Sequence, residues 1–138
     1  MKSAIIIDTS TLVAFVDKSD DFHQWTVEQW KKLHPPLFTC EAVVAESCFL
    51  LQNVYGGENA ILSLLELEVV KIPFHLNEDV TAIKLLMKQY QAVPMSLADA
   101  CLVRMSELIR GSSVFTLDSD FRIYRQYTNQ IIPVVMPE

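Results

Sequence analysis

Two short apolar runs that each end at an aspartate constrain this sequence more than any other feature. The first run, Ile5 to Ile7, stops at Asp8, and the second, Val114 to Leu117, stops at Asp118. A continuous apolar run is typical of a strand that helices cover on both faces. In open α/β sheets, ligands bind beyond the carboxyl ends of the strands. The two aspartates are therefore predicted to meet in one crevice at the edge of a sheet.

Helical and strand-like segments alternate along the rest of the chain. Apolar periodicity, capping residues and breakers predict strands over residues 3–8, 69–74, 113–117 and 131–135, with helices over residues 9–15, 21–33, 40–55, 58–67, 77–90, 96–110 and 120–126. Strands separated by helices throughout predict a parallel sheet with helices on both sides. The 138 residues, 51% hydrophobic and 20% charged, suit one compact domain over residues 1–138.

The charge balance restricts the ligands that this chain can hold. A formal net charge of -6 argues against binding nucleic acid through a general basic surface. If nucleic acid is the ligand, local positive charge has to come from elsewhere, and a bound divalent cation is the natural source.

The cysteines and histidines carry no sign of a soft-metal site. Cys40, Cys48 and Cys101 form no C-x-x-C pair, and the three histidines show no paired ligand spacing. We expect buried, reduced thiols in apolar helical stretches, which favours a cytoplasmic location. No apolar run approaches the length that spans a membrane, so no membrane partner is expected.

Four of the acidic residues can be interpreted as helix caps as well as functional groups. Asp8 either caps the helix that begins after it or binds a metal ion. Asp99 lies in a Ser96-x-x-Asp99 capping box, where it can cap the helix or present a carboxylate at the edge of the crevice. Asp118 repeats the Asp8 arrangement, and Asp120 follows it, so that one of the two is expected to cap the next short helix.

Glu46 is predicted to lie on the apolar stripe of its helix. Its neighbours on that helical face are Ala42, Val43, Phe49 and Leu50, so the carboxylate is expected to face the core. A buried glutamate needs a partner, and either a salt bridge to lysine or arginine or a metal ion could provide it.

Convergence of these acids would require cations. Two carboxylates about 4 Å apart repel by about 4 kcal/mol at an effective dielectric constant of 20. Oxygen ligands without histidine or thiolate favour Mg²⁺ or Mn²⁺ over zinc or copper, and such sites commonly hold phosphate-bearing substrates.

At this point the residues resemble a known family, the PIN domain, and within it the small VapC-type ribonuclease toxins. The resemblance spans essentially the whole chain in length, motif order and alternation of elements. It is carried by four stretches: Ile7-Asp8-Thr9-Ser10, Val44-Ala45-Glu46, Leu97-Ala98-Asp99-Ala100, and Thr116-Leu117-Asp118-Ser119-Asp120-Phe121.

The resemblance implies a three-layer α/β/α sandwich with a central parallel sheet and a cluster of acids at its carboxyl edge. It implies that Asp8, Glu46, Asp99 and Asp118 are catalytic metal-binding residues, with Asp120 as an auxiliary ligand and Ser10 and Thr116 as polar support. The implied activity is Mg²⁺- or Mn²⁺-dependent hydrolysis of RNA phosphodiester bonds by a metal-activated water. A cognate antitoxin and a homodimer are the implied protein partners.

Two groups of residues outside the acidic motifs have open interpretations. Arg104, Arg110, Arg122 and Arg125 are candidates for contacting the RNA backbone, with Arg104 and Arg122 foremost, or else are surface charges or antitoxin contacts. An aromatic group on the second helix, comprising Phe22, Trp25 and Trp30, either packs in the core or forms a dimer or antitoxin groove.

Other functional classes fit the sequence less well. A haloacid-dehalogenase-like domain needs a second aspartate two residues after Asp8, where Ser10 stands, and a receiver domain needs a late lysine, yet no lysine follows Lys88. A PIN-like fold kept as a non-catalytic protein-interaction module is the remaining alternative. It predicts the loss of one or more acids, and none is missing.

Overall fold

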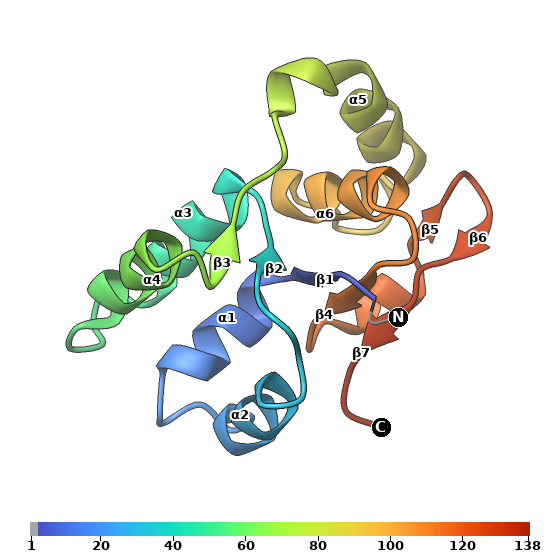
Figure 1. Ribbon diagram of the computed structural model, residues 1–138. Helices are drawn as coiled ribbons and strands as arrows, with labels where there is room; N and C mark the ends of the chain where they lie inside the picture. The colour runs from blue at the N-terminus through green and yellow to red at the C-terminus, as the bar shows by residue number, and fades with distance from the viewer. Residues whose placement is uncertain (1–2) are drawn as a thin grey trace.

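A computed structural model of the chain describes residues 3–138 and has a five-stranded parallel sheet at its centre (Figure 1). The strand order is β3-β2-β1-β4-β7, and every pairing in this sheet is parallel. All three residues of the central strand β1 are buried, as the continuous apolar run predicts. The strands are β1 (Ile5–Ile7), β2 (Leu37–Phe38), β3 (Val70–Lys71), β4 (Ser113–Phe115) and β7 (Val134–Val135).

Helices cover both faces of this sheet. In Figure 1, α5 and α6 lie above the sheet, α1 and α2 lie below it, and α3 and α4 lie on the side of β3. The predicted three-layer α/β/α fold with a central parallel sheet is confirmed. The α-helices are α1 (Thr9–Val16), α2 (His23–Trp30), α3 (Glu41–Leu50), α4 (Gly57–Glu66), α5 (Val80–Gln89) and α6 (Leu97–Leu108); two 3₁₀ helices are η1 (Leu76–Glu78) and η2 (Ser119–Arg122).

The structure differs from the predicted elements mainly at short strands. The two-residue strand β2 was not predicted, because so short a run carries no periodicity. The predicted strand over residues 131–135 divides at Pro133, and only β7 joins the main sheet. β6 (Gln130–Ile131) instead pairs antiparallel with β5 (Arg125–Gln126), which occupies the end of the helix predicted over residues 120–126.

Three of the helix caps that the sequence indicates are present: Asp8 caps α1, Ser96 caps α6 and Asp118 caps η2. Ser96 caps α6 in a complete capping box with Asp99. The Thr39 hydroxyl, close to the start of α3, does not cap that helix but donates to the Ile7 carbonyl at 2.9 Å, because that carbonyl is buried at the end of β1 and needs a donor. Asn77 lies within η1, and Asp79 occupies the N-cap position of α5.

The two tryptophans of the predicted aromatic group pack against the core, whereas Phe22 of the same group is 45% exposed. Trp30 stacks on Phe15 with 3.7 Å between ring centroids, and Trp25 packs against Phe115 at 5.9 Å, which supports core packing of both tryptophans. All three cysteines are free; Cys40 and Cys101 are buried, and Cys48 is half-buried. Over residues 3–138, each helix is too short or too polar to span a membrane.

Candidate metal centre

Four of the predicted acids line one cavity of about 290 Å³ at the carboxyl edge of the sheet. Asp8 directly follows β1, Glu46 lies on α3, Asp99 lies in the first turn of α6, and Asp118 precedes η2. The parallel strands thus bring distant acids to one place, while their role as metal ligands stays a prediction. The cavity is lined by Asp8, Thr9, Ser10, Glu46, Leu50, Ser96, Asp99 and Asp118.

Asp8 is the most deeply buried of these acids, with only 4% of its surface exposed. Its Oδ1 accepts a hydrogen bond from the Thr9 amide at 2.7 Å, and its Oδ2 accepts from the hydroxyls of Thr116 at 2.7 Å and Ser10 at 3.0 Å. Burial raises the pKa of Asp8 to about 6, the Asp99 charge adds to this, and the three hydrogen bonds oppose it. Asp8 therefore caps α1 and also lines the cavity, so the cap is confirmed and its role as a metal ligand stays a prediction.

Ser10 and Thr116 connect Asp8 to the segment that carries Asp118. The Ser10 hydroxyl accepts from the Leu117 amide at 2.9 Å while it donates to Asp8. The Thr116 hydroxyl accepts from the Asp118 amide, also at 2.9 Å, while it too donates to Asp8. Each hydroxyl thus has both a donor and an acceptor partner, and the Asp8 carboxylate is held in one orientation, while the role of the two hydroxyls in supporting a metal ligand stays a prediction.

Asp99 is held from two directions. Its amide donates to the Ser96 hydroxyl at 3.0 Å, and its Oδ2 accepts from the Ser96 amide at 3.2 Å and from the Tyr124 hydroxyl at 3.1 Å. Burial raises the pKa of Asp99, and the charge of Asp118 adds to this. Burial and the nearby Asp99 charge raise the pKa of Tyr124 well above its usual range, so this phenol stays a neutral donor. Tyr124 was missed, because no local pattern links it to Asp99.

Asp118 and Asp120 have different surroundings. Oδ1 of Asp118 accepts from the Asp120 amide at 2.9 Å, so that Asp118 is the acid that caps η2. Asp120 is not among the residues that line the cavity, and its auxiliary metal role stays a prediction.

Glu46 does not face the core, and this prediction was wrong. Glu46 is exposed, and Phe49 and Leu50 on the same helical face are 66% and 55% exposed. The buried face of α3 consists of Val43 and Ser47, four residues apart, because this face meets α1 and α6. Glu46 lines the cavity as an exposed side chain and needs no salt bridge to offset burial.

The donors around the cavity suit a hard cation. They are carboxylate and hydroxyl oxygens, which match the preference of Mg²⁺ and Mn²⁺, and no lysine or arginine of the described chain lines the cavity. Across residues 3–138, no three His, Cys, Asp or Glu side chains lie close enough to hold an ion as they stand. The donor chemistry therefore fits a divalent cation, whose binding would have to draw mutually repelling carboxylates together.

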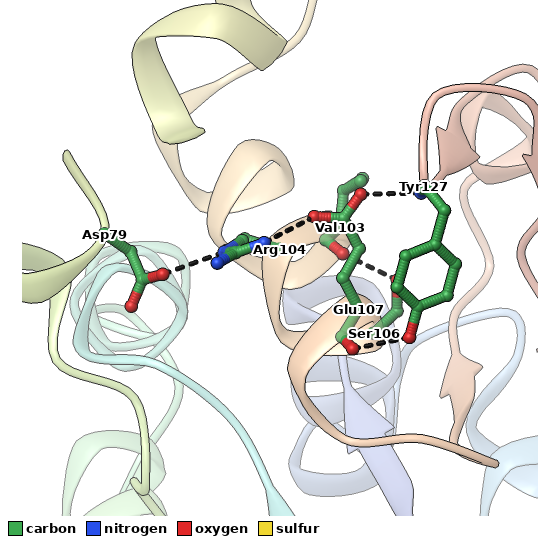
Figure 2. A network of polar contacts seen from close by, with 6 residues as sticks. All are labelled: Asp79, Val103, Arg104, Ser106, Glu107 and Tyr127. Atoms are coloured by element: carbon green, nitrogen blue, oxygen red, sulfur yellow. Dashed lines mark hydrogen bonds and ion pairs between the residues drawn. The ribbon is translucent and has the colours of Figure 1, made fainter. Parts of the chain in front are cut away.

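The arginines proposed to contact RNA lie outside this cavity lining. Arg104 forms ion pairs with Asp79 at 2.8 Å and Glu107 at 3.0 Å (Figure 2). Arg125 donates to backbone carbonyls of residues 122–124, and Arg122 is exposed. An RNA contact by Arg104 or Arg122 stays a prediction, and Arg104 would have to leave two carboxylates to make one.

Comparisons with known proteins agree with this geometry. The sequence model of the PIN domain family matches residues 5–126, which include all four carboxylates of the cavity. The crystal structure of VapC20 from Mycobacterium tuberculosis, described as a Sarcin-Ricin loop cleaving toxin, superposes with a TM-score of 0.70 at 20% sequence identity, covering 94% of this chain and 100% of that one. A comparison with curated proteins gave no match. The structural likeness shows a shared fold.

Proposed function

The chain belongs to the PIN domain family, and on this premise we propose that it is a metal-dependent endoribonuclease that hydrolyses RNA phosphodiester bonds. The observation that carries the proposal is the meeting of Asp8, Glu46, Asp99 and Asp118 on one cavity without a lysine or arginine in its lining. The buried acids of this group raise one another's pKa, and a cation bound among them would relieve this repulsion. A cation-filled acidic cavity at a sheet edge is suited to a phosphate-bearing substrate.

The four carboxylates would hold Mg²⁺ or Mn²⁺. When bound, the cation would supply a Lewis acid that polarises the phosphodiester and makes a water molecule more acidic. Ser10 and Thr116 hold the Asp8 carboxylate through its Oδ2, and Ser96 and Tyr124 hold Asp99 through its Oδ2. Glu46 would contribute an exposed carboxylate from the cavity lining.

The proposal extends to a role as the toxin of a toxin–antitoxin pair in the cytoplasm. It is supported by the family and by a fold shared with a toxin that cleaves RNA. The partners would be an RNA substrate, a cognate antitoxin and a second copy of the chain. Expression of the chain alone should slow bacterial growth, and expression of variants in the four acids should not.

The test of the nuclease is cation-dependent cleavage of RNA. Purified protein incubated with single-stranded RNA should cleave it in millimolar Mg²⁺ or Mn²⁺ and lose this activity in excess EDTA. Asp21→Asn, a substitution of an exposed acid that lies outside the cavity lining, is the matched control and should cleave normally. A folded protein that cleaves no RNA under any of these conditions would favour the non-catalytic interaction module.

A further inference from the structure

Tyr124 contacts an acid of the cavity and is tightly enclosed by neighbouring residues. It follows η2, its side chain is completely buried, and its ring meets the rings of Tyr90 and Phe121 edge-on at 5.2 and 5.3 Å. The hydroxyl lies 3.1 Å from Oδ2 of Asp99 and 3.4 Å from the Pro94 carbonyl. Since a phenol has one proton, the nearer and charged carboxylate is its acceptor.

The two oxygens of Asp99 are consequently unequal. Oδ2 receives hydrogen bonds from the Tyr124 hydroxyl and the Ser96 amide, whereas Oδ1 receives none from residues 3–138. Turning Oδ2 away would leave the buried hydroxyl with only the more distant Pro94 carbonyl at 3.4 Å, and losing a good acceptor costs a buried donor about 1–3 kcal/mol. Oδ1 is therefore the oxygen that remains available to a cation.

We propose that Tyr124 is a positioning residue that orients Asp99 for cation binding. The inference rests on the proposed function and adds to it a residue outside the four acids. Tyr124 also joins two acid-bearing segments, because it follows the η2 segment that Asp118 caps and bonds to Asp99 on α6. Tyr124 contacts Asp99 but does not line the cavity. It therefore affects the affinity for the cation and does not touch the reacting atoms.

The test compares two phenylalanine substitutions that each remove one buried tyrosine hydroxyl. Tyr124→Phe keeps the ring packing and deletes the donor to Asp99. Tyr90→Phe is the matched control, because its hydroxyl accepts from the Arg125 amide at 2.8 Å and bonds to no cavity acid. Both variants should lose a similar amount of thermal stability without metal, about 3–5 °C in Tm, since each loses one hydrogen bond.

The decisive measurement is the Kd for Mn²⁺, obtained by electron paramagnetic resonance of free Mn²⁺ in the absence of RNA. Tyr124→Phe should raise this Kd by about 10–100-fold, the usual effect of removing a hydrogen bond that orients a metal ligand. Tyr90→Phe should leave it unchanged. In RNA cleavage, Tyr124→Phe should require more Mn²⁺ for half-maximal rate while kcat at saturating Mn²⁺ stays near that of the wild type.

A double-mutant cycle then assigns the effect to Asp99. In an Asp99→Asn background, Tyr124→Phe should produce little further loss of Mn²⁺ affinity, because the two side chains act together. An unchanged Kd in Tyr124→Phe, or an equal loss in Tyr90→Phe, would overturn the positioning role while leaving the proposed function in place. Absence of Mn²⁺ binding by the wild-type protein would overturn both.

Discussion

The helix α6 carries acids near both ends, and they have opposite electrostatic surroundings. Near its start, Asp99 shares a cavity with Asp8 and Asp118, with no lysine or arginine of the described chain in its lining. Near its end, Glu107 is paired with Arg104, which also binds Asp79. The difference shows two roles of a carboxylate. An acid in an ion pair with arginine holds elements of the fold together, whereas an acid without a lysine or arginine partner is available to a ligand.

The paired acids belong to what we call the Arg104 network, comprising Asp79, Arg104, Glu107 and Tyr127 (Figure 2). Arg104 joins the start of α5 to α6 through Asp79, and the second oxygen of Glu107 accepts from the Tyr127 amide at 2.7 Å. Tyr127 has a φ of 51°, in the left-handed region, which non-glycine residues adopt at a cost. The contacts to Glu107 hold the β5–β6 hairpin in this conformation against α6.

The largest effect is expected on RNA cleavage, when an acid of the cavity is changed rather than an acid of the Arg104 network. Asp8→Asn should lower the cleavage rate by at least about 100-fold, because it removes the negative charge of a proposed cation ligand from the cavity. Asp79→Asn, which alters an acid of the Arg104 network, should keep most of the rate. Rates are measured on single-stranded RNA at saturating Mg²⁺, with circular dichroism to confirm folding. Full activity of Asp8→Asn would remove the catalytic assignment of this acid.

The second largest effect is expected in the pH dependence of the free energy of unfolding. The pKa of Asp8 lies at about 6 rather than at its ordinary 3.8, so the folded state binds this proton more tightly than the unfolded state. Protonation of Asp8 therefore contributes in full to the free energy of unfolding below pH 4. This contribution, about 3 kcal/mol in total, is lost as the pH rises to about 6.

Urea unfolding in EDTA at several pH values tests this contribution. Relative to the wild type, Asp8→Asn should gain stability between pH 4 and pH 7, because asparagine has no proton to lose. A stability difference between the two proteins that is independent of pH would contradict the raised pKa.

Removing the cation of the Arg104 network should lower stability without affecting the cavity. Arg104→Ala leaves the carboxylates of Asp79 and Glu107, whose side chains are 14% and 11% exposed, without their ion pair. Because Arg104 itself is 29% exposed, we expect a loss of about 1–3 kcal/mol in unfolding free energy, less than for a fully buried pair. Arg104→Lys should recover part of this loss. A wild-type stability in Arg104→Ala would show that the network contributes little.

The smallest expected effect is stabilisation by metal. Mg²⁺ at about ten times its Kd should raise the unfolding free energy by about 1.4 kcal/mol, seen as an increase in Tm of a few degrees. Asp118→Asn should reduce the increase, and Arg104→Ala should retain it from a lower starting Tm. If Mg²⁺ and Mn²⁺ leave the wild-type Tm unchanged, the cavity does not bind these ions in the folded protein.

Features that depend on neighbouring residues could be predicted from the sequence. The buried strand that stops at Asp8 follows from an uninterrupted apolar run, and the capping box of Ser96 and Asp99 follows from their three-residue spacing. The crevice at the sheet edge also follows, because strands alternating with helices require parallel connections that place strand ends together. The short strands β2 and β5 could not be predicted, since two residues form a strand only where a partner is present.

The sequence by itself thus determined the parallel α/β architecture and the acids at its edge, because periodicity, capping and strand ends are local properties of the chain. Only the tertiary structure decided that Glu46 is exposed, that Tyr124 holds Asp99, and that Arg104 is paired. The exposure of Glu46 depends on which face of its helix the neighbouring elements cover. The other two outcomes depend on contacts between residues 25 positions apart in the chain, Arg104 with Asp79 and Tyr124 with Asp99. Such contacts form only when packing brings distant elements together, and no spacing in the sequence encodes them.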